Sequence, residues 1–212
     1  MQASTDLGGK EYCAIRFPKL WRQFGSSADV RIPMFWKGLE TRYGEKHRHY
    51  HTFEHIKFCL EVFERFKYLA HRPSMVEVAI FYHDAVYDVD RPEPQNEERS
   101  AGMAVHFLDH REQQPEEMII VKNLILATKH DPKRTLIDND EQLIVDIDLA
   151  GLGAPWEVFL KNNRNVRAEY AHVPEEKFRE VNGKSSDSFL IAGRSTIIRP
   201  STGCTASRQK KI

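Results

Sequence analysis

Residues 50–70, YHTFEHIKFCLEVFERFKYLA, decide the fold class of this chain. Apolar side chains recur in this stretch at three- and four-residue steps, namely Phe53, Ile56, Leu60, Phe63 and Phe66. This spacing puts them on one face of an α-helix, and such a helix buries that face against neighbouring elements. The stretch therefore predicts a long amphipathic helix over 50–70.

The same helical period continues on both sides of this stretch. It predicts further helices over Phe17–Phe24, from Asp29 as N-cap to Gly44, from Pro73 through the His83-Asp84 pair, and over Asn96–His110, Pro115–Thr128, Asp138–Leu149 and Pro155–Ala171. Strand-like alternation is clear only at Val145–Leu149, which we also interpret as helix. We expect an all-α fold with one helical domain over 1–194. Residues 195–212 lack aromatic and acidic side chains, which predicts a polar, basic tail.

Composition narrows the class of protein. The 212 residues carry 31 basic and 31 acidic side chains, and this zero net charge argues against general nucleic-acid binding. No apolar run approaches the roughly 18–20 residues of a membrane helix, and the polar N-terminus has no signal-peptide core. The cysteines Cys13, Cys59 and Cys204 are odd in number and far apart, so they predict neither disulfides nor a zinc motif. We expect a cytoplasmic protein without membrane contact.

Histidines and buried carboxylates mark three stretches that could carry chemistry. His51 and His55 lie four residues apart, so on one helix they would share a face. His83 and Asp84 lie in an otherwise apolar stretch, with Asp88 one helical turn later. A buried aspartate needs a cationic partner, which could be an arginine or a metal ion.

The third stretch, Leu143–Leu149, contains two more carboxylates. Asp146 and Asp148 lie about 200° apart on a helix, so only one of them can face a shared site. Two imidazoles and two carboxylates suit Zn, Mn, Fe, Co or Ni, and Mg less well. Together the three stretches predict a divalent-metal site.

The order His, His-Asp, Asp on a helical chain resembles the HD-domain superfamily of metal-dependent phosphohydrolases. The pattern is most similar to a bacterial group of small predicted members without an assigned substrate. Six sequence blocks, in order within roughly Phe17–Ala171, carry the resemblance: Arg48–His51, His83–Asp88, Asn96–Ala101, Ala127–His130, Asp146–Leu149 and Arg167–Tyr170. The resemblance implies an HD-type helical bundle with short flanking helices.

The resemblance also implies roles for individual residues. The metal ligands would be His55, His83, Asp84 and Asp148, with Asp148 preferred over Asp146 on the spacing to the apolar residues that follow. The catalytic acids or bases would be His51, Asp88 and Glu97. Substrate contacts would come from Arg48, Lys129, His130 and Arg167. For Arg167, an ion pair with a carboxylate such as Glu169 or Glu97 is an equal alternative.

These roles predict a phosphohydrolase that uses a divalent ion to activate water against a small phosphorylated compound, with a nucleotide as one candidate. Two alternatives stay open. One is a non-catalytic, metal-stabilised nucleotide-binding module, and the other is a di-iron oxygenase, for which His130 or His51 would supply extra ligands. A homodimer is a further open alternative, and the substrate itself is not readable from the sequence.

Overall fold

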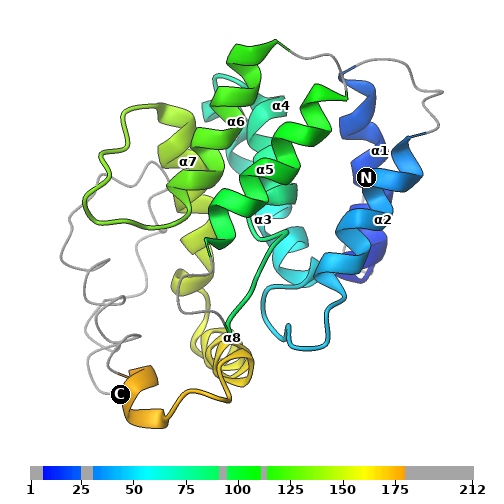
Figure 1. Ribbon diagram of the computed structural model, residues 1–212. Helices are drawn as coiled ribbons and strands as arrows, with labels where there is room; N and C mark the ends of the chain where they lie inside the picture. The colour runs from blue at the N-terminus through cyan, green and yellow to red at the C-terminus, as the bar shows by residue number, and fades with distance from the viewer. Residues whose placement is uncertain (1–6, 25–30, 91–94, 111–113, 180–212) are drawn as a thin grey trace.

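The computed structural model describes residues 7–24, 31–90, 95–110 and 114–179 (Figure 1). All regular secondary structure in these ranges is helical, so the predicted all-α fold is confirmed for them. The expected N-cap Asp29, the expected domain end at 194 and the expected tail 195–212 lie outside the described residues.

The elements follow in chain order as α1 (Gly9–Arg22), α2 (Ile32–Tyr43), α3 (Phe53–Phe66), the 3₁₀ helix η1 (Lys67–Leu69), α4 (Pro73–Tyr82), α5 (Asn96–Asp109), α6 (Pro115–Ala127), α7 (Asn139–Asp148), the 3₁₀ helix η2 (Leu149–Gly153) and α8 (Trp156–Glu169).

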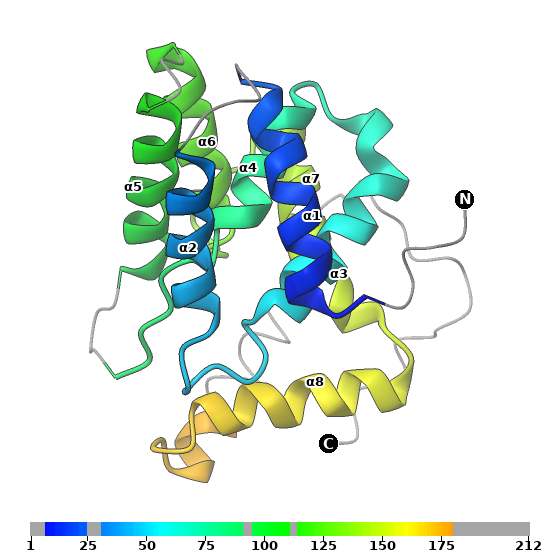
Figure 2. The ribbon, with the colours of Figure 1, turned by 90° about the vertical axis from the view of Figure 1, so that its right-hand side faces the viewer.

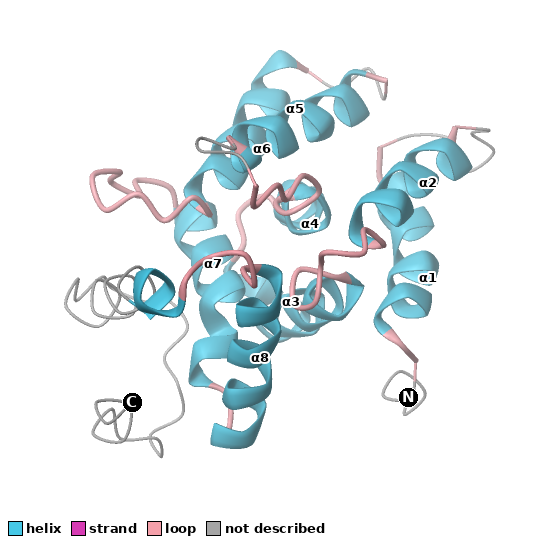
Figure 3. Ribbon diagram, turned by 60° about the horizontal axis from the view of Figure 1, so that its bottom comes forward, coloured by secondary structure: helices cyan, strands magenta, loops and turns pink. Residues whose placement is uncertain are grey.

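Helix α4 forms the centre of the bundle. Every residue from Met75 to Tyr82 is buried, because apolar side chains surround this helix on all sides. Figure 3 shows α4 nearly end-on with the other helices around it. The single charge on α4, Glu77, accepts a hydrogen bond of 2.7 Å from Nε of Arg16 on α1. A buried charge is tolerated when it is paired in this way.

Aromatic rings join the N-terminal helices to this centre. Phe107 of α5 meets Trp21 of α1 at a centroid distance of 5.1 Å and Phe35 of α2 at 5.4 Å, both edge to face. Phe17 meets Phe81 of α4 in the same manner at 5.4 Å. Such contacts add stability beyond the buried apolar area. The bundle thus has one continuous core.

Helix α8 lies across one end of the bundle, roughly perpendicular to α1, α2 and α5 (Figure 2). It follows α7 directly through η2, and Glu169 is its one buried residue. Within the described ranges, no helix combines the length and apolar character needed to cross a membrane.

Helices α1, α3 and α4 have bounds that differ from the sequence-based prediction. Helix α1 begins at Gly9, well before Phe17. The helix predicted over 50–70 begins at Phe53, because the Thr52 side chain accepts the Glu54 N–H and caps it, and 67–69 are 3₁₀ helix. Helix α4 ends at Tyr82, so Asp84 and Asp88 are not on it and do not share a helical face.

Candidate metal centre

Four side chains from α3, α7 and the segment at the C-terminal end of α4 meet at one point of the bundle. His55 lies in the first turn of α3, His83 caps the C-terminus of α4, Asp84 follows it, and Asp148 ends α7. One ligand atom from each residue, a ring nitrogen or a carboxylate oxygen, lies within 4.8 Å of the other three, and this group could hold a metal ion. The structure thus brings together the four predicted ligands, and Asp148 is the α7 carboxylate among them.

The spacing of the donor atoms fits a first-row divalent ion. Nε2 of His55 lies 3.3 Å from Nε2 of His83 and 3.1 Å from Oδ1 of Asp148. Oδ2 of Asp84 lies 3.0 Å from Nε2 of His83 and 3.6 Å from Nε2 of His55. An ion with bonds of about 2.1 Å separates its ligands by about 3.0 Å at right angles and about 3.4 Å at tetrahedral angles.

Hydrogen bonding leaves His83 in the tautomer that a metal ligand needs. Nδ1 of His83 lies 2.9 Å from the backbone oxygen of Ile80. A carbonyl only accepts, so Nδ1 carries the hydrogen and donates it. In the neutral ring, Nε2 then presents its lone pair to the cluster. A second ring nitrogen held by a backbone carbonyl is the usual support of a histidine ligand.

Charge accumulates at this point of the structure. Burial acts to raise the pKa of Asp84 and of Asp148, but the imidazoles around them outweigh it and hold both pKa values below their ordinary range. Burial likewise acts to lower the pKa of His83, and the charges of Asp84 and Asp148 reverse this and raise it. The two partly buried carboxylates therefore need positive charge, from imidazolium groups or from a bound cation.

His51 lies beside the cluster, although not on the helix that carries His55. It belongs to the turn before α3, and its ring centroid is 5.8 Å from that of His55. The prediction that His51 and His55 share a helical face is therefore wrong, although their two rings do lie close together. The ring of Tyr87 stacks on His51 at a centroid distance of 3.9 Å, which holds the imidazole plane in place.

Glu169 of α8 fixes His51 from the other side of the turn. Its Oε1 accepts the backbone N–H groups of His49, Tyr50 and His51 at 2.8–2.9 Å, and its Oε2 accepts Nδ1–H of His51 at 2.7 Å. The carboxylate is fully buried. Burial raises the pKa of Glu169, but the His51 imidazole and the backbone amides outweigh it and lower the pKa. The dyad fixes Nδ1 of His51 as the hydrogen-bonded nitrogen and leaves Nε2 for chemistry.

The sequence singled out Glu169 only as a partner for Arg167. The signal was present in the Arg167–Tyr170 block, but the two ends of the Glu169–His51 bond are 118 residues apart. No local pattern connects them. Arg167 itself donates to Glu175 at 2.9 Å and to the backbone oxygen of Tyr170 at 2.5 Å. It therefore makes an ion pair with a carboxylate other than the two expected ones.

Arg48 is buried and holds the backbone that carries the ligands. Its guanidinium donates to the backbone oxygens of His51 at 3.2 Å and Asp84 at 2.6 Å, and also to Ala85 at 3.1 Å. Nε donates to Glu45 at 3.0 Å. These bonds tie the His51 turn to the Asp84 segment. The expected contact of Arg48 with a phosphate stays a prediction.

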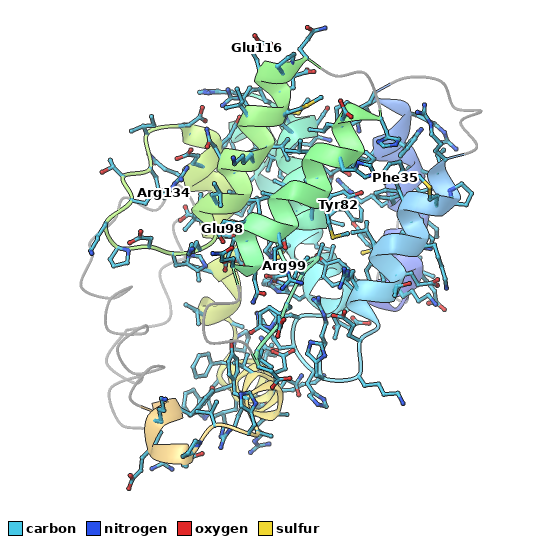
Figure 4. The ribbon with its side chains drawn as sticks, in the orientation of Figure 1. Phe35, Tyr82, Glu98, Arg99, Glu116 and Arg134 are labelled. Atoms are coloured by element: carbon cyan, nitrogen blue, oxygen red, sulfur yellow. The ribbon has the colours of Figure 1, made fainter. Side chains whose placement is uncertain are left out.

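The start of α5 carries Glu97, Glu98 and Arg99, and Figure 4 labels the last two at the lower end of this helix. Burial, together with the charge of Asp84, raises the pKa of Glu97. Glu98 forms an ion pair with Lys129 at 2.6 Å. Glu97 thus lies within electrostatic reach of the cluster.

Asp88 lies away from the four-residue cluster. Its Oδ2 is 3.4 Å from Arg99, and its backbone N–H donates to Oδ1 of Asn96 at 2.9 Å. It lines a pocket of about 160 Å³ whose walls also include Arg42, Glu45 and His47, and none of the four cluster residues. Its expected catalytic role stays a prediction.

His130 reaches the cluster from the segment after α6. Its Nε2 lies 3.0 Å from Oδ2 of Asp148. His130 and His51 are the residues that a di-iron oxygenase would use as extra ligands, and in this structure each donates one hydrogen bond to a carboxylate.

A second group of His71, Asp138 and Asp140 also has closely spaced donor atoms. The Arg72 guanidinium already pairs with both carboxylates, with Asp138 and, at 3.0 Å, with Asp140. Asp140 additionally accepts the His71 N–H at 2.8 Å. This group is therefore an ion-pair network that joins the start of α7 to the start of α4.

Comparison of the chain with protein-family models, with curated proteins and with solved structures found no match. The fold and the site define the protein as an all-helical bundle with a buried His/Asp cluster that could hold a metal ion.

Proposed function

We propose that this protein is a metal-dependent phosphohydrolase of the HD type, which acts on a small phosphorylated compound in the cytoplasm. One observation carries the proposal: the donor atoms of the four-residue cluster lie 3.0–3.6 Å from their neighbours. The six sequence blocks that resemble HD phosphohydrolases support it.

The cluster would hold one divalent ion through Nε2 of His55, Nε2 of His83 and the carboxylates of Asp84 and Asp148. The candidate ions are Mn, Zn, Fe, Ni, Co and Mg, and the two imidazoles favour the first five. When bound, such an ion lowers the pKa of water from about 15.7 toward about 7 and polarises a phosphoryl oxygen.

The chain's own contribution to ester cleavage is a proton for the leaving oxygen. His51 can hold this proton at Nε2, because its Nδ1–H is engaged by Glu169. Burial acts to lower the pKa of His51, but Asp84 and Glu169 outweigh it and raise the pKa, so the protonated ring persists to higher pH. A positioned acid of this kind contributes about 10²–10⁴-fold to the rate. Glu97, whose pKa is also raised, is the second candidate acid.

Phosphate recognition needs cations that can exchange partners. Lys129 meets this need best among the expected contacts. Its ammonium is about half exposed and its ion pair with Glu98 lies at the surface. Surface ion pairs contribute little to stability, so a phosphate can replace the carboxylate at low cost. Arg167 is a weaker candidate for this contact, because its described bonds lie outside the cluster. The catalytic role expected of Asp88 is weaker for the same reason.

The test is hydrolysis of a panel of phosphomonoesters and phosphodiesters by the full chain, stripped of metal and reloaded with each candidate ion. We expect turnover with at least one ion and its loss in Asp148→Asn. Asp146→Asn is the matched control, because Asp146 lies on the same helix outside the cluster, and it should keep the parent's rate.

Absence of turnover across the panel in the metal-loaded parent would contradict the proposal and favour the non-catalytic binding module. Oxygen consumption by the iron-loaded protein would favour the oxygenase.

A further inference from the structure

The backbone of His130 is in an unusual conformation. Its φ is 54°, in the left-handed region, directly after α6 and its C-cap Thr128. Residues with a Cβ rarely adopt this conformation, because Cβ comes too close to the following carbonyl oxygen. Strained backbone of this type persists only where surrounding structure enforces it, and it concentrates at functional sites.

The side chain of His130 makes a directed contact with one oxygen of a cluster carboxylate. Nε2 lies 3.0 Å from Oδ2 of Asp148. Since a carboxylate oxygen only accepts, Nε2 carries the hydrogen and donates it. A nitrogen that carries a hydrogen has no lone pair for a metal ion. In this arrangement Nε2 of His130 is therefore not a metal donor, and His130 lies outside the four-residue group whose donor atoms could hold an ion.

The two oxygens of Asp148 face different partners. Oδ1 lies 3.1 Å from Nε2 of His55 and 3.5 Å from Nε2 of His83, while Oδ2 faces His130. The last torsion of an aspartate is broad, so the plane of its carboxylate is set by its contacts. A donor on Oδ2 turns Oδ1 toward the two imidazoles.

We propose that His130 is a positioning residue, which orients Asp148 so that Oδ1 faces the point between His55 and His83. The inference rests on the proposed metal centre and adds a part to it. The left-handed backbone brings the imidazole back toward the C-terminal end of α7. Loss of such an outer hydrogen bond typically costs 10–100-fold in metal affinity.

The experiment compares His130→Gln with His130→Met in the full chain. The two side chains have similar length and bear the same backbone strain, but only glutamine keeps a donor near the position of Nε2. The probe is Co²⁺, titrated into metal-free protein and followed by its visible absorption. We expect His130→Met to bind Co²⁺ about 10–100-fold more weakly than the parent. His130→Gln should restore the affinity to within a few fold, with the spectrum of the parent.

Equal affinity in His130→Met and the parent would overturn the inference. So would a changed spectrum in His130→Gln, because this would make the imidazole a ligand. His130→Gly, which relieves the strain and removes the donor, should bind as weakly as His130→Met while keeping its helical circular dichroism. If the parent binds Co²⁺ but hydrolyses no ester, the proposed activity fails and the role of His130 stands. If the parent binds no Co²⁺, both fail.

Discussion

Glu169 is the residue through which the last helix acts on the candidate site. One carboxylate satisfies three consecutive backbone N–H groups before α3 and also holds His51. A group with this many buried donors is hard to replace, because each donor left without an acceptor costs free energy. Glu169 therefore stabilises the turn that contains His51 and also favours the protonated form of the His51 imidazole.

We predict that Glu169→Gln lowers the free energy of unfolding by about 2 kcal/mol at pH 7, because a charged acceptor is replaced by a neutral one. The effect should depend on pH. The folded-state pKa of Glu169 lies below its ordinary value of 4.5, so its charge stabilises the fold above pH 4.5. The difference between parent and variant should therefore shrink as the pH falls through the lowered pKa.

Urea unfolding of the metal-free proteins between pH 3 and pH 7 measures this difference. Glu175→Gln is the control, since Glu175 is half exposed and pairs with Arg167 at the surface. Its variant should unfold at the same urea concentration as the parent at pH 7, because an exposed ion pair contributes little to stability. If the unfolding free energies of Glu169→Gln and the parent differ by the same amount from pH 3 to pH 7, then the charge of Glu169 does not stabilise the fold.

At the scale of elements, the approach of α1 to α3 explains a boundary that the sequence did not predict. The first turn of α1 is polar and carries no apolar stripe. The apolar spacing alone therefore predicted a start at Phe17 instead of Gly9. The backbone of Gly9 packs against the backbone of Phe53, and its N–H donates to Glu54 at 2.6 Å. This contact between distant segments sets the start of α1, together with the Glu11 carboxylate, which accepts the Gly8 N–H at 3.1 Å.

We predict that Gly9→Ala destabilises the protein by about 1–3 kcal/mol, because the new Cβ would lie 2.6 Å from the backbone nitrogen of Glu54. Gly102→Ala is the matched control in α5. Nothing lies within 4 Å of its added Cβ, so it should stabilise by about 0.5–1 kcal/mol. Chemical denaturation of the three proteins measures both changes. Equal stability of Gly9→Ala and the parent would contradict this prediction, because α1 could then move away from α3 without a loss of unfolding free energy.

Other elements were predictable because their signals are local. The apolar spacing from Phe53 to Phe66 gave a helix close to α3, and the helix predicted over Asp138–Leu149 differs from α7 by one residue at each end. The end of α4 at Tyr82 was not predictable from spacing, because the apolar pattern runs on past it. The four cluster residues followed from sequence order and resemblance, while their distances depend on how α3, α4 and α7 pack.

At the scale of the whole molecule, a core that runs through the bundle should fold without metal. Metal binding then adds stability by mass action, about 2.7 kcal/mol at a free concentration of 100 times Kd. For a chain of this size we predict a rise in Tm of roughly 5–10 °C.

Thermal melting with Mn²⁺, Zn²⁺ or Ni²⁺, and with a chelator, measures this rise. His83→Gln should melt near the chelated parent and show no rise with metal. Unfolding of the parent by the chelator alone at room temperature would contradict a core that is stable without the ion.

The metal content of the purified protein decides whether the His/Asp cluster holds an ion. The measurement is elemental analysis of the full chain purified without chelator, next to Asp84→Asn and Asp146→Asn prepared in the same way. The account predicts about one divalent ion per chain in the parent and in Asp146→Asn, and its loss in Asp84→Asn. A parent that holds no metal, even after reconstitution with Mn, Zn, Fe or Ni, would contradict it and leave the cluster as a buried network of ion pairs.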